Sequence, residues 1–214
     1  KMHKKIIQLL AVLILAPLAF SALAQPARFV EGTHYVVLPT PVKTNDPAKI
    51  EVVEVFWYGC SHCFRFEPLI ENWEASLAAD VDFVRFPGMW NDLMKIHAQA
   101  FFTAEALNVL DKVHSPMFDA INVQGNRLQN EQQLSAFFVQ YGVTAEQFST
   151  AFNSFSVRTK VNQAEAKMRE YQVRSTPNMV VNGKYLISTG EAVLTQQDML
   201  EVVNFLVEKE RSSS

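Results

Sequence analysis

Apolar residues follow two different periods along the chain, and the change of period separates strands from helices. Residues 50–58 (IEVVEVFWY) form an almost unbroken apolar run rich in valine and aromatic side chains, which predicts a strand buried on both faces. From Ser61 the apolar residues recur at helical spacing, so we expect a helix that begins there and ends near Ala79. Shorter runs at 34–38 and 81–86 predict two further strands.

The middle of the chain, residues 91–168, has repeated helix signals and no convincing strand pattern. Asn130 to Gln133 and Thr144 to Gln147 have the composition of capping boxes, and each is followed by an apolar stripe. We expect the phenylalanines of these stripes in the core of a helical bundle: Phe137, Phe138, Phe148, Phe152 and Phe155.

Strand character returns after Pro177. Residues 178–181 and 184–187 flank an Asn-Gly dipeptide, which is favoured in two-residue hairpin turns. An amphipathic run at 196–210 predicts a final helix. The chain therefore has the pattern of an α/β domain that is interrupted by helices after its third strand and completed by a hairpin and a helix.

The N-terminus has the pattern of an export signal. A basic start at residues 2–5 precedes an apolar run at 6–20 and a small-residue cleavage signal at 21–24. We expect residues 1–24 to be removed, leaving a mature chain that begins at Gln25. A membrane-spanning helix is the alternative, but the run falls short of the ~20 apolar residues needed and contains a proline.

Composition and charge exclude several classes of protein. Apolar residues make up 49% of the chain, so it can bury a substantial core and wholesale disorder is not expected. The leader contains three lysines and no acids, so its removal changes the net charge from −3 to −6. An acidic chain without basic runs gives no reason to expect nucleic-acid binding.

Both cysteines of the chain, Cys60 and Cys63, lie where the strand at 50–58 gives way to the helix. A structural disulfide stabilises most when it closes a long loop, so one between these neighbours would add little. Half of a zinc site is a second alternative, but there is no other cysteine and the histidines are scattered. Exported proteins meet oxidising conditions, in which disulfides persist. The close spacing of the two cysteines therefore favours a disulfide with a redox function over a structural one.

The position of Cys60 at a helix N-terminus favours its thiolate, because free N–H groups and a partial positive charge stabilise an anion. Cys63, one turn into the helix, is expected to be more buried and to form a disulfide with Cys60. A hydroxyl from Ser61 and a positive charge on His62 would stabilise the thiolate further. A stabilised thiolate favours the reduced form, so the disulfide is expected to be a strong oxidant of other thiols.

The sequence resembles the thioredoxin superfamily, and within it the DsbA-like periplasmic thiol:disulfide oxidoreductases. The resemblance covers the mature chain and rests on C-x-H-C followed by Phe64 and Phe66-Glu67, D-K-V at 111–113, N-S-F at 153–155 and V-N-G-K-Y at 181–185. It implies a thioredoxin-like α/β fold in which residues 89–168 form an inserted helical domain between residues 25–88 and 169–214. It also implies that the cysteine pair works without a cofactor or a metal.

The resemblance assigns roles to three more positions. Glu54 matches a buried acid that relays protons for the buried sulfur, here Cys63; the alternative place for this side chain is a solvated strand face. Pro177 matches a cis-proline that packs across from the cysteines. Thr176 matches the residue whose backbone pairs with a substrate strand.

The implied function is donation of the Cys60–Cys63 disulfide to reduced, unfolded exported proteins in the periplasm. A DsbB-like membrane quinone reductase would reoxidise the protein. A monomer is expected, because residues 25–49 are too few for the N-terminal dimerisation domain that isomerases of the superfamily usually carry.

Two positions depart from the best-known oxidase of the family, which has proline where this chain has Ser61 and valine where it has Thr176. Threonine at the second position also occurs in disulfide isomerases. An isomerase or reductase is therefore one alternative function, and a peptide-binding chaperone with an inert disulfide is another.

Overall fold

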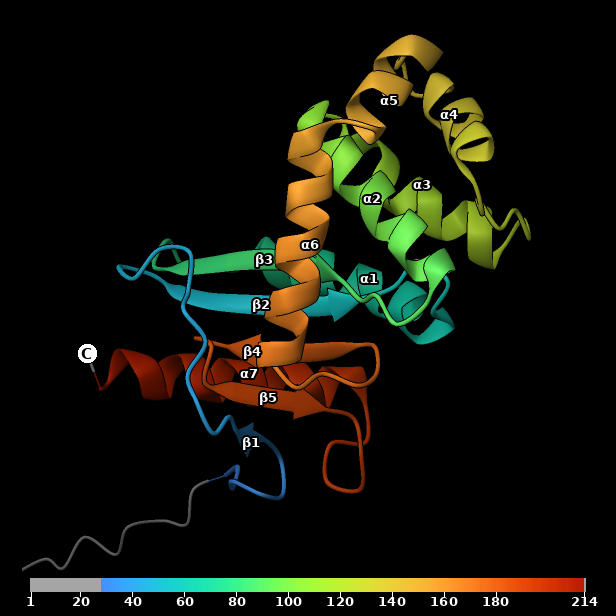
Figure 1. Ribbon diagram of the computed structural model, residues 1–214. Coiled ribbons are helices and arrows are strands. Elements are labelled where there is room, and N and C mark those ends of the chain that lie inside the picture. Colours follow the sequence, from blue (N-terminus) through green and yellow to red (C-terminus); the bar gives the residue numbers. More distant parts are fainter. Residues whose placement is uncertain (1–27, 214) are drawn as a thin grey trace, which may run out of the picture.

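The computed structural model describes residues 28–213, so the predicted leader at 1–24 lies outside the described residues. Figure 1 shows a twisted sheet with a group of helices beyond one of its edges. In chain order the elements are β1 (Val36–Val37), β2 (Ile50–Phe56), α1 (Ser61–Glu74), β3 (Val81–Pro87), α2 (Asp92–Ala106), α3 (Leu110–Asn122), α4 (Glu131–Val139), α5 (Ala145–Phe152), α6 (Phe155–Glu170), β4 (Asn178–Val181), β5 (Tyr185–Ser188) and α7 (Gln196–Arg211). In this part of the chain no helix is long and apolar enough to cross a membrane.

The sheet has the strand order β1-β5-β4-β2-β3, with β2 near its centre. β2 pairs in parallel with β3 and antiparallel with β4, and the hairpin β4–β5 and the short β1 complete the sheet with antiparallel pairs. Every residue of β2 is buried, which confirms the strand predicted from the unbroken apolar run. The strand ends at Phe56 rather than Tyr58, because the chain turns away there toward α1.

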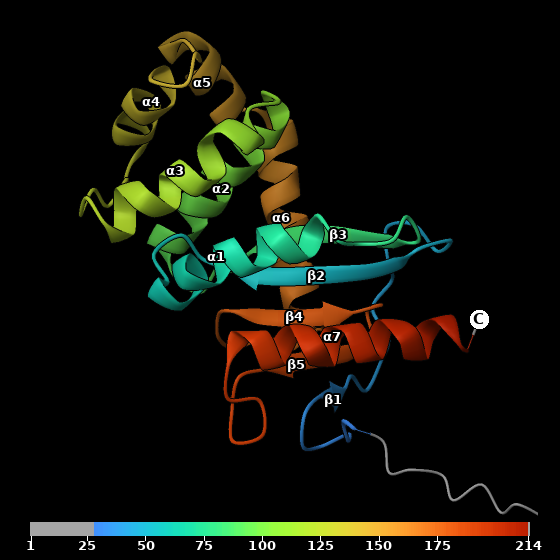
Figure 2. The ribbon, with the colours of Figure 1, turned by 180° about the vertical axis from the view of Figure 1, so that it is seen from behind.

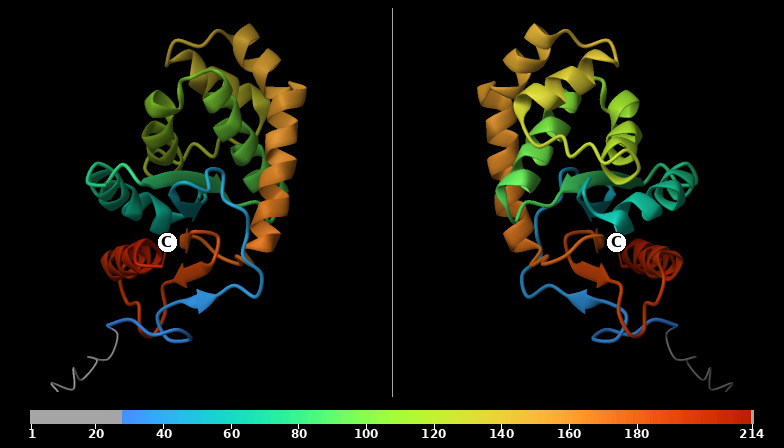
Figure 3. Two further views of the ribbon diagram at one scale, coloured as in Figure 1. Left: turned by 90° about the vertical axis from the view of Figure 1, so that its left-hand side faces the viewer. Right: turned by 90° about the vertical axis from the view of Figure 1, so that its right-hand side faces the viewer.

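Side chains of β2 alternate between two apolar layers, as the two-residue period of a strand requires. Val52 packs with side chains of α1 and α7, whereas Val53 and Val55 pack with the end of α6 and the segment that follows it. Figures 2 and 3 show α1 and α7 on one face of the sheet and α6 on the other. Glu54 has the same parity as Val52, so it lies on the face that α1 covers.

The inserted helices, α2–α6, enclose a core of their own beyond the β3 edge (Figure 1). Phe56, Tyr58 and Cys63 belong to this core as well, so the segment around the cysteines packs against the inserted helices. Thr144 and Gln147 form the complete capping box that the sequence predicts for α5.

Three predictions about element ends need correction. The expected helix from Ser61 to Ala79 ends at Glu74, and the strand predicted at 34–38 has only the two residues of β1. Asn130 caps α4, but the side chain of Gln133 accepts the N–H of Gln129 instead of the N–H of Asn130. The capping box is therefore incomplete.

The prediction that Phe155 lies in the core was wrong. Phe155 is 79% exposed, whereas the other phenylalanines of the two stripes are buried. Ser154 caps a new helix, α6, so Phe155 begins a different helical face and does not continue the stripe of α5.

Candidate active site

Strand directions bring three segments together at one end of the sheet. Because β2 and β3 are parallel, the residues that follow them, Cys60 and Gly88, leave the sheet at the same end. β4 runs antiparallel to β2, so Thr176 and Pro177, which precede it, arrive at that end as well. The Cys60 sulfur lies 3.5 Å from the carbonyl oxygen of Thr176, so residues 116 positions apart meet at the sulfur.

Cys60 is the N-cap of α1. Its backbone is extended, with φ −90° and ψ 111°, and its sulfur accepts the backbone N–H of Cys63 at 3.3 Å. An oxygen of serine, threonine or aspartate usually occupies this position, since the first N–H groups of a helix have no partner within the helix. A sulfur in that place receives hydrogen bonds best when it is negatively charged.

The pKa of Cys60 is lowered from its ordinary value of 9.0 to about 5. The hydrogen bond from the Cys63 thiol is the largest cause, and burial acts against it. Smaller lowering effects come from the Thr176 side chain and from the backbone N–H groups of Cys63 and His62. At neutral pH the Cys60 sulfur is therefore a thiolate.

Cys63 has the opposite character. Both cysteines are free thiols, but Cys63 is fully buried in the core shared with the inserted helices, whereas Cys60 reaches solvent. Burial raises the pKa of Cys63 far above its usual value, and its hydrogen bond to Cys60 and the charges of Cys60 and Glu54 raise it further. Two identical side chains three residues apart thus differ in charge at neutral pH.

Ser61 and His62, the two residues between the cysteines, are both exposed. The imidazole Nδ1 of His62 lies 3.1 Å from a guanidinium nitrogen of Arg65, and the His62 carbonyl accepts a hydrogen bond from Gln196 at 2.6 Å. The backbone N–H of His62, rather than its ring, is among the groups that lower the pKa of Cys60. The tuning role of its ring stays a prediction.

Glu54 is fully buried on β2, which excludes the solvated strand face considered for it. Its Oε2 lies 3.8 Å from Nε of Arg85, the residue opposite it on β3, and neither Glu54 oxygen has a hydrogen-bond partner among the described protein atoms. Burial, helped by the negative charge of Glu67 and opposed by Arg85, raises the pKa of Glu54 from 4.5 to about 8. At neutral pH this acid therefore holds its proton.

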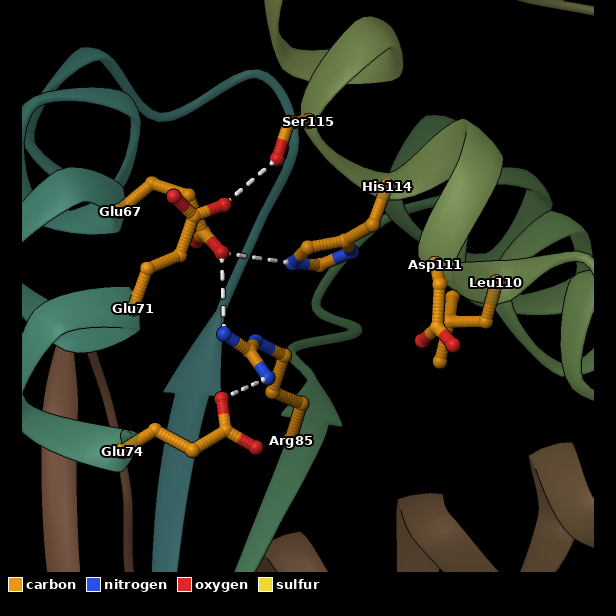
Figure 4. A pocket seen from close by; sticks show the side chains of 8 residues that line it. All are labelled: Glu67, Glu71, Glu74, Arg85, Leu110, Asp111, His114 and Ser115. Carbon is orange, nitrogen blue, oxygen red and sulfur yellow. Dashed lines mark hydrogen bonds and ion pairs between the residues drawn. The ribbon is translucent and has the colours of Figure 1, made fainter. Parts of the chain in front are cut away.

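A polar cleft of about 220 Å³ lies between α1, β3 and α3, and Arg85 is one of the residues that line it. Figure 4 shows Glu67 and Glu74 of α1 pointing toward Arg85, with His114 of α3 opposite. Arg85 bonds Glu67 at 3.1 Å and Glu74 at 2.9 Å, and Nε2 of His114 lies 3.3 Å from Glu67. Burial opposes ionisation of Glu67, but His114 and Arg85 hold its pKa below the usual value. Glu67 and Glu74 therefore balance the positive charge of Arg85, and an ionised Glu54 is not needed for this.

The peptide bond between Thr176 and Pro177 is cis, as the resemblance implied, and Pro177 is buried. The Thr176 carbonyl that precedes it lies 3.5 Å from the Cys60 sulfur. Gly88 separates Thr176 from Trp90: a Cβ at Gly88 would lie 2.9 Å from the Trp90 ring and 3.2 Å from the Thr176 methyl group. Trp90 is 42% exposed, so an apolar side chain reaches the surface beside Gly88.

Sequence reasoning missed the polar residues that surround the predicted ones. Glu67 and Arg85 flank Glu54, and His97, His114 and Asn122 contact the segment before Cys60. Only Glu67 had a local signal, since it lies four residues after Cys63 on the same helix face. The others come from β3, α2 and α3 and are brought close by tertiary structure alone.

A thiolate at a helix N-terminus, a buried partner thiol and a protonated buried acid are together equipped for thiol–disulfide exchange. The sequence from residue 70 to residue 201 matches the family described as DSBA-like thioredoxin domain. This chain belongs to that family. The matched range begins after the cysteines, so it does not include Cys60 and Cys63.

Relatives of the family match nearly the whole chain. The thiol:disulfide interchange protein DsbA of Pseudomonas aeruginosa is 39% identical over 206 residues, covering 96% of this chain and 97% of its own length. The protein of the same name from Azotobacter vinelandii is 42% identical over 188 residues, covering 88% of this chain and 87% of its own. The crystal structure of Pseudomonas aeruginosa DsbA superposes with a TM-score of 0.83 at 39% identity, covering 86% of this chain and 96% of that one.

These relatives and the geometry agree on fold and activity. The chain has the DsbA-like thioredoxin fold, in which helices are inserted between β3 and β4. It is a thiol:disulfide oxidoreductase that exchanges disulfides with other proteins.

Proposed function

We propose that this protein works as an oxidase in the periplasm, where it donates the Cys60–Cys63 disulfide to exported proteins that are still unfolded. The observation that carries this direction of reaction is the contrast between the two sulfurs. The thiolate of Cys60 is stabilised at the N-cap of α1, with a pKa lowered to about 5, while the burial of Cys63 favours its thiol. A couple whose reduced form is stabilised in this way passes its disulfide to other thiols.

The reaction begins when a substrate thiolate attacks the sulfur of Cys60 in the oxidised protein. The Cys60–Cys63 bond breaks, a mixed disulfide forms, and Cys63 leaves with the electron pair. Glu54 is protonated at neutral pH and is electrostatically linked to Cys63, so we assign it the proton that converts this leaving thiolate into a thiol.

A second substrate thiolate then attacks the substrate sulfur of the mixed disulfide. Cys60 is a good leaving group because its thiolate is stable at neutral pH. The substrate loses two electrons and gains a disulfide, and the protein is left as the dithiol. We assign Thr176 and Pro177 the contact with the substrate chain, because the Thr176 carbonyl lies 3.5 Å from the Cys60 sulfur.

The dithiol needs an electron acceptor before it can react again. We propose a DsbB-like membrane protein that passes the two electrons to a quinone, with the cysteine pair as the only redox group of this protein. The same proposal includes a monomer, a cleaved leader at residues 1–24, and an inserted helical domain at 89–168 between the two parts, 25–88 and 169–214, of the thioredoxin-like domain. The order of the strands and inserted helices supports this division.

The test is oxidation of a reduced, unfolded protein by catalytic amounts of the oxidised protein, with a quinone-linked partner or glutathione disulfide as the final oxidant. We expect rapid formation of substrate disulfides and little repair of scrambled ones. Cys60→Ser should abolish the reaction. Cys63→Ser cannot form the Cys60–Cys63 disulfide and should not catalyse the reaction. With glutathione disulfide as the oxidant it should accumulate mixed disulfides at Cys60, because the neighbouring thiol that would displace them is absent.

Efficient repair of scrambled disulfides, together with weak oxidation of reduced substrate, would assign the protein to the isomerases instead. Binding of unfolded protein without any disulfide transfer would leave only the chaperone alternative. Size measurement during the same experiment tests the proposed monomer.

A further inference from the structure

Residues 57–59 form the turn that leads into Cys60, and hydrogen bonds from the inserted helices, rather than from the sheet, hold this turn. Hydrogen bonds from α2 and α3 reach both the side chains and the backbone of this turn. None of these bonds takes part in the reaction proposed above.

The first contact holds Trp57. Its indole Nε1–H donates to Nδ1 of His97 on α2 at 3.1 Å, and the two rings are stacked with an interplanar angle of 27°. Because Nδ1 accepts, the ring proton of His97 lies on Nε2, which is 3.0 Å from the carbonyl oxygen of Arg127. His97 is buried, and burial lowers its pKa, so the neutral ring that this arrangement requires is the stable one.

Two further contacts hold Tyr58. Its hydroxyl lies 2.8 Å from Nδ1 of His114, and its carbonyl oxygen accepts a hydrogen bond from the side-chain amide of Asn122 at 2.8 Å. Both partners are on α3, and Asn122 is fixed by a second bond to the carbonyl of Phe118 at 2.9 Å. Side chain and backbone of Tyr58 are therefore attached to the same helix.

The backbone of Trp57 contacts both cysteines, so its position affects theirs. Its carbonyl oxygen accepts the backbone N–H of Cys60 at 2.9 Å, and its backbone hydrogen-bonds the sulfur of Cys63. Its ring lies directly against Gly59, where a Cβ would come within 2.3 Å of the indole. A shift of the indole therefore has to move Gly59, and with it the backbone of Cys60.

We propose that His97, His114 and Asn122 are positioning residues that hold Cys60 in the N-cap geometry of α1. They form a clamp through which the inserted helices maintain the alignment between the Cys60 sulfur and the N–H of Cys63. The clamp rests on the proposed function only in taking Cys60 as the sulfur that exchanges with the substrate. It gives the inserted helices a part in thiol–disulfide exchange, since a looser turn weakens the hydrogen bonds that stabilise the thiolate.

The test compares variants that remove one clamp bond with a control that removes a similar bond elsewhere. Asn122→Ala deletes the bond to the Tyr58 carbonyl, and Trp57→Phe keeps a ring against Gly59 while deleting the donor to His97. The control is Gln99→Ala on α2, because the Gln99 amide donates to the carbonyl of Phe152, inside the inserted helices, at 2.6 Å. Thiolate absorbance of each reduced protein is followed from about pH 3 to pH 9, the range in which a shifted thiol titrates.

We expect each clamp variant to raise the pKa of Cys60 by about 0.5, which is about a threefold fall in the ratio of thiolate to thiol. The equilibrium with glutathione should move toward the disulfide by a similar factor. Gln99→Ala should lower the melting temperature while leaving both values at those of the parent. Should Asn122→Ala fail to fold, Tyr58→Phe removes only the bond to His114 without creating a large cavity and gives the same readout.

Unchanged Cys60 titration in both clamp variants would overturn the inference, as would an equal shift in Gln99→Ala. These outcomes are separate from failure of the proposed function. A parent protein that does not oxidise substrates, combined with shifted titration in the clamp variants, would reject the oxidase assignment and leave the clamp standing.

Discussion

The two thiols differ in burial and in the hydrogen bonds that they receive, and a buried acid lies on the strand before them. Cys60 keeps enough access to solvent and to the free N–H groups of α1 for its thiolate to be stable. Cys63, fully buried in the core beside it, holds its proton, and so does Glu54 beneath the pair. The position of each group in the fold therefore decides which of the three is ionised at neutral pH.

Glu54 should make the stability of the reduced protein fall as the pH rises. In the unfolded chain it loses its proton near pH 4.5, but in the folded protein it keeps the proton up to about pH 8. The folded state therefore binds more protons between these values, and its stability declines through this window. Glu54→Gln should remove that decline, so its gain over the parent is expected to grow from near zero at about pH 4.5 to about 4 kcal/mol near pH 8. Urea unfolding at several pH values measures it.

Glu74→Gln is the matched control for this prediction. Glu74 also bonds Arg85, at 2.9 Å, but its side chain is 42% exposed, so the loss of its charge should change stability by less than about 1 kcal/mol at any pH. A Glu54→Gln variant whose advantage over the parent does not vary with pH would show that Glu54 is ionised in the folded protein.

The residues that carry chemistry differ in how far the sequence could reveal them. Cys60 and Cys63 are close together in the chain, separated by Ser61 and His62, and their chemistry follows from the strand-to-helix boundary around them. Glu54 required the inference that its strand is central, which the apolar run supports. His97 and Asn122 could not be found in this way, because their partners lie 40 and 64 residues away and the contact depends on how α2 and α3 dock.

At the scale of elements, the pairing of the hairpin β4–β5 with β2 brings Thr176, just before β4, to the Cys60 sulfur. The hairpin closes through Asn182 and Gly183, whose φ values of 49° and 61° match the turn predicted from the Asn-Gly pair. Gly183 also lies against the loop before β2, where its carbonyl oxygen accepts the N–H of Val42 at 2.8 Å.

Gly183→Ala should destabilise the fold strongly without altering the cysteines. A Cβ there would lie 1.9 Å from the Val42 carbonyl oxygen, and the left-handed backbone adds strain of its own. We expect a loss of at least about 2 kcal/mol in urea unfolding, with the Cys60 titration unchanged. Gly190→Ala is the control: it has no atom within 4 Å of the new Cβ and should stay within about 0.5 kcal/mol of the parent. Similar losses at both glycines would mean that the hairpin turn is not constrained by the loop at Val42.

Element types were predictable, but several element ends were not, and the reason is the same in each case. An apolar period continues wherever side chains reach the core, whether or not the backbone is helical. Leu77 packs onto the core from the loop after α1, so the stripe of α1 extends beyond Glu74, where the helix ends. At Phe155 the period coincides by chance with the start of a new helix.

At the scale of the whole molecule, the redox state of one cysteine pair should set the stability of the fold. Groups at the start of α1 and the side chain of Thr176, which precedes β4, stabilise the Cys60 thiolate. The unfolded chain offers no such geometry. Reduction therefore adds an interaction to the folded state that the disulfide form lacks.

The reduced protein is thus expected to melt at a higher temperature than the oxidised protein. The pKa of Cys60 is lowered from 9.0 to about 5, so its thiolate stabilises the fold fully above pH 9 and loses this effect as the pH falls through 5. At neutral pH the contribution is about 1–3 kcal/mol, or about 3–10 °C in melting temperature. The opposing effect of the cross-link on the unfolded chain grows with loop length, so it is at the low end of its range for this short loop.

Thermal unfolding with and without reductant, at pH values between about 5 and 8, measures both the sign and the pH dependence. The difference between reduced and oxidised melting temperatures should widen as the pH rises, because the thiolate contribution grows while the cross-link term does not depend on pH. Cys60→Ser, which has neither disulfide nor thiolate at this position, should show no response to reductant. If reduction lowers the melting temperature throughout this range, the disulfide is the stabilised form. The protein would then be a poor donor, and the isomerase or inert-disulfide alternative would fit it better.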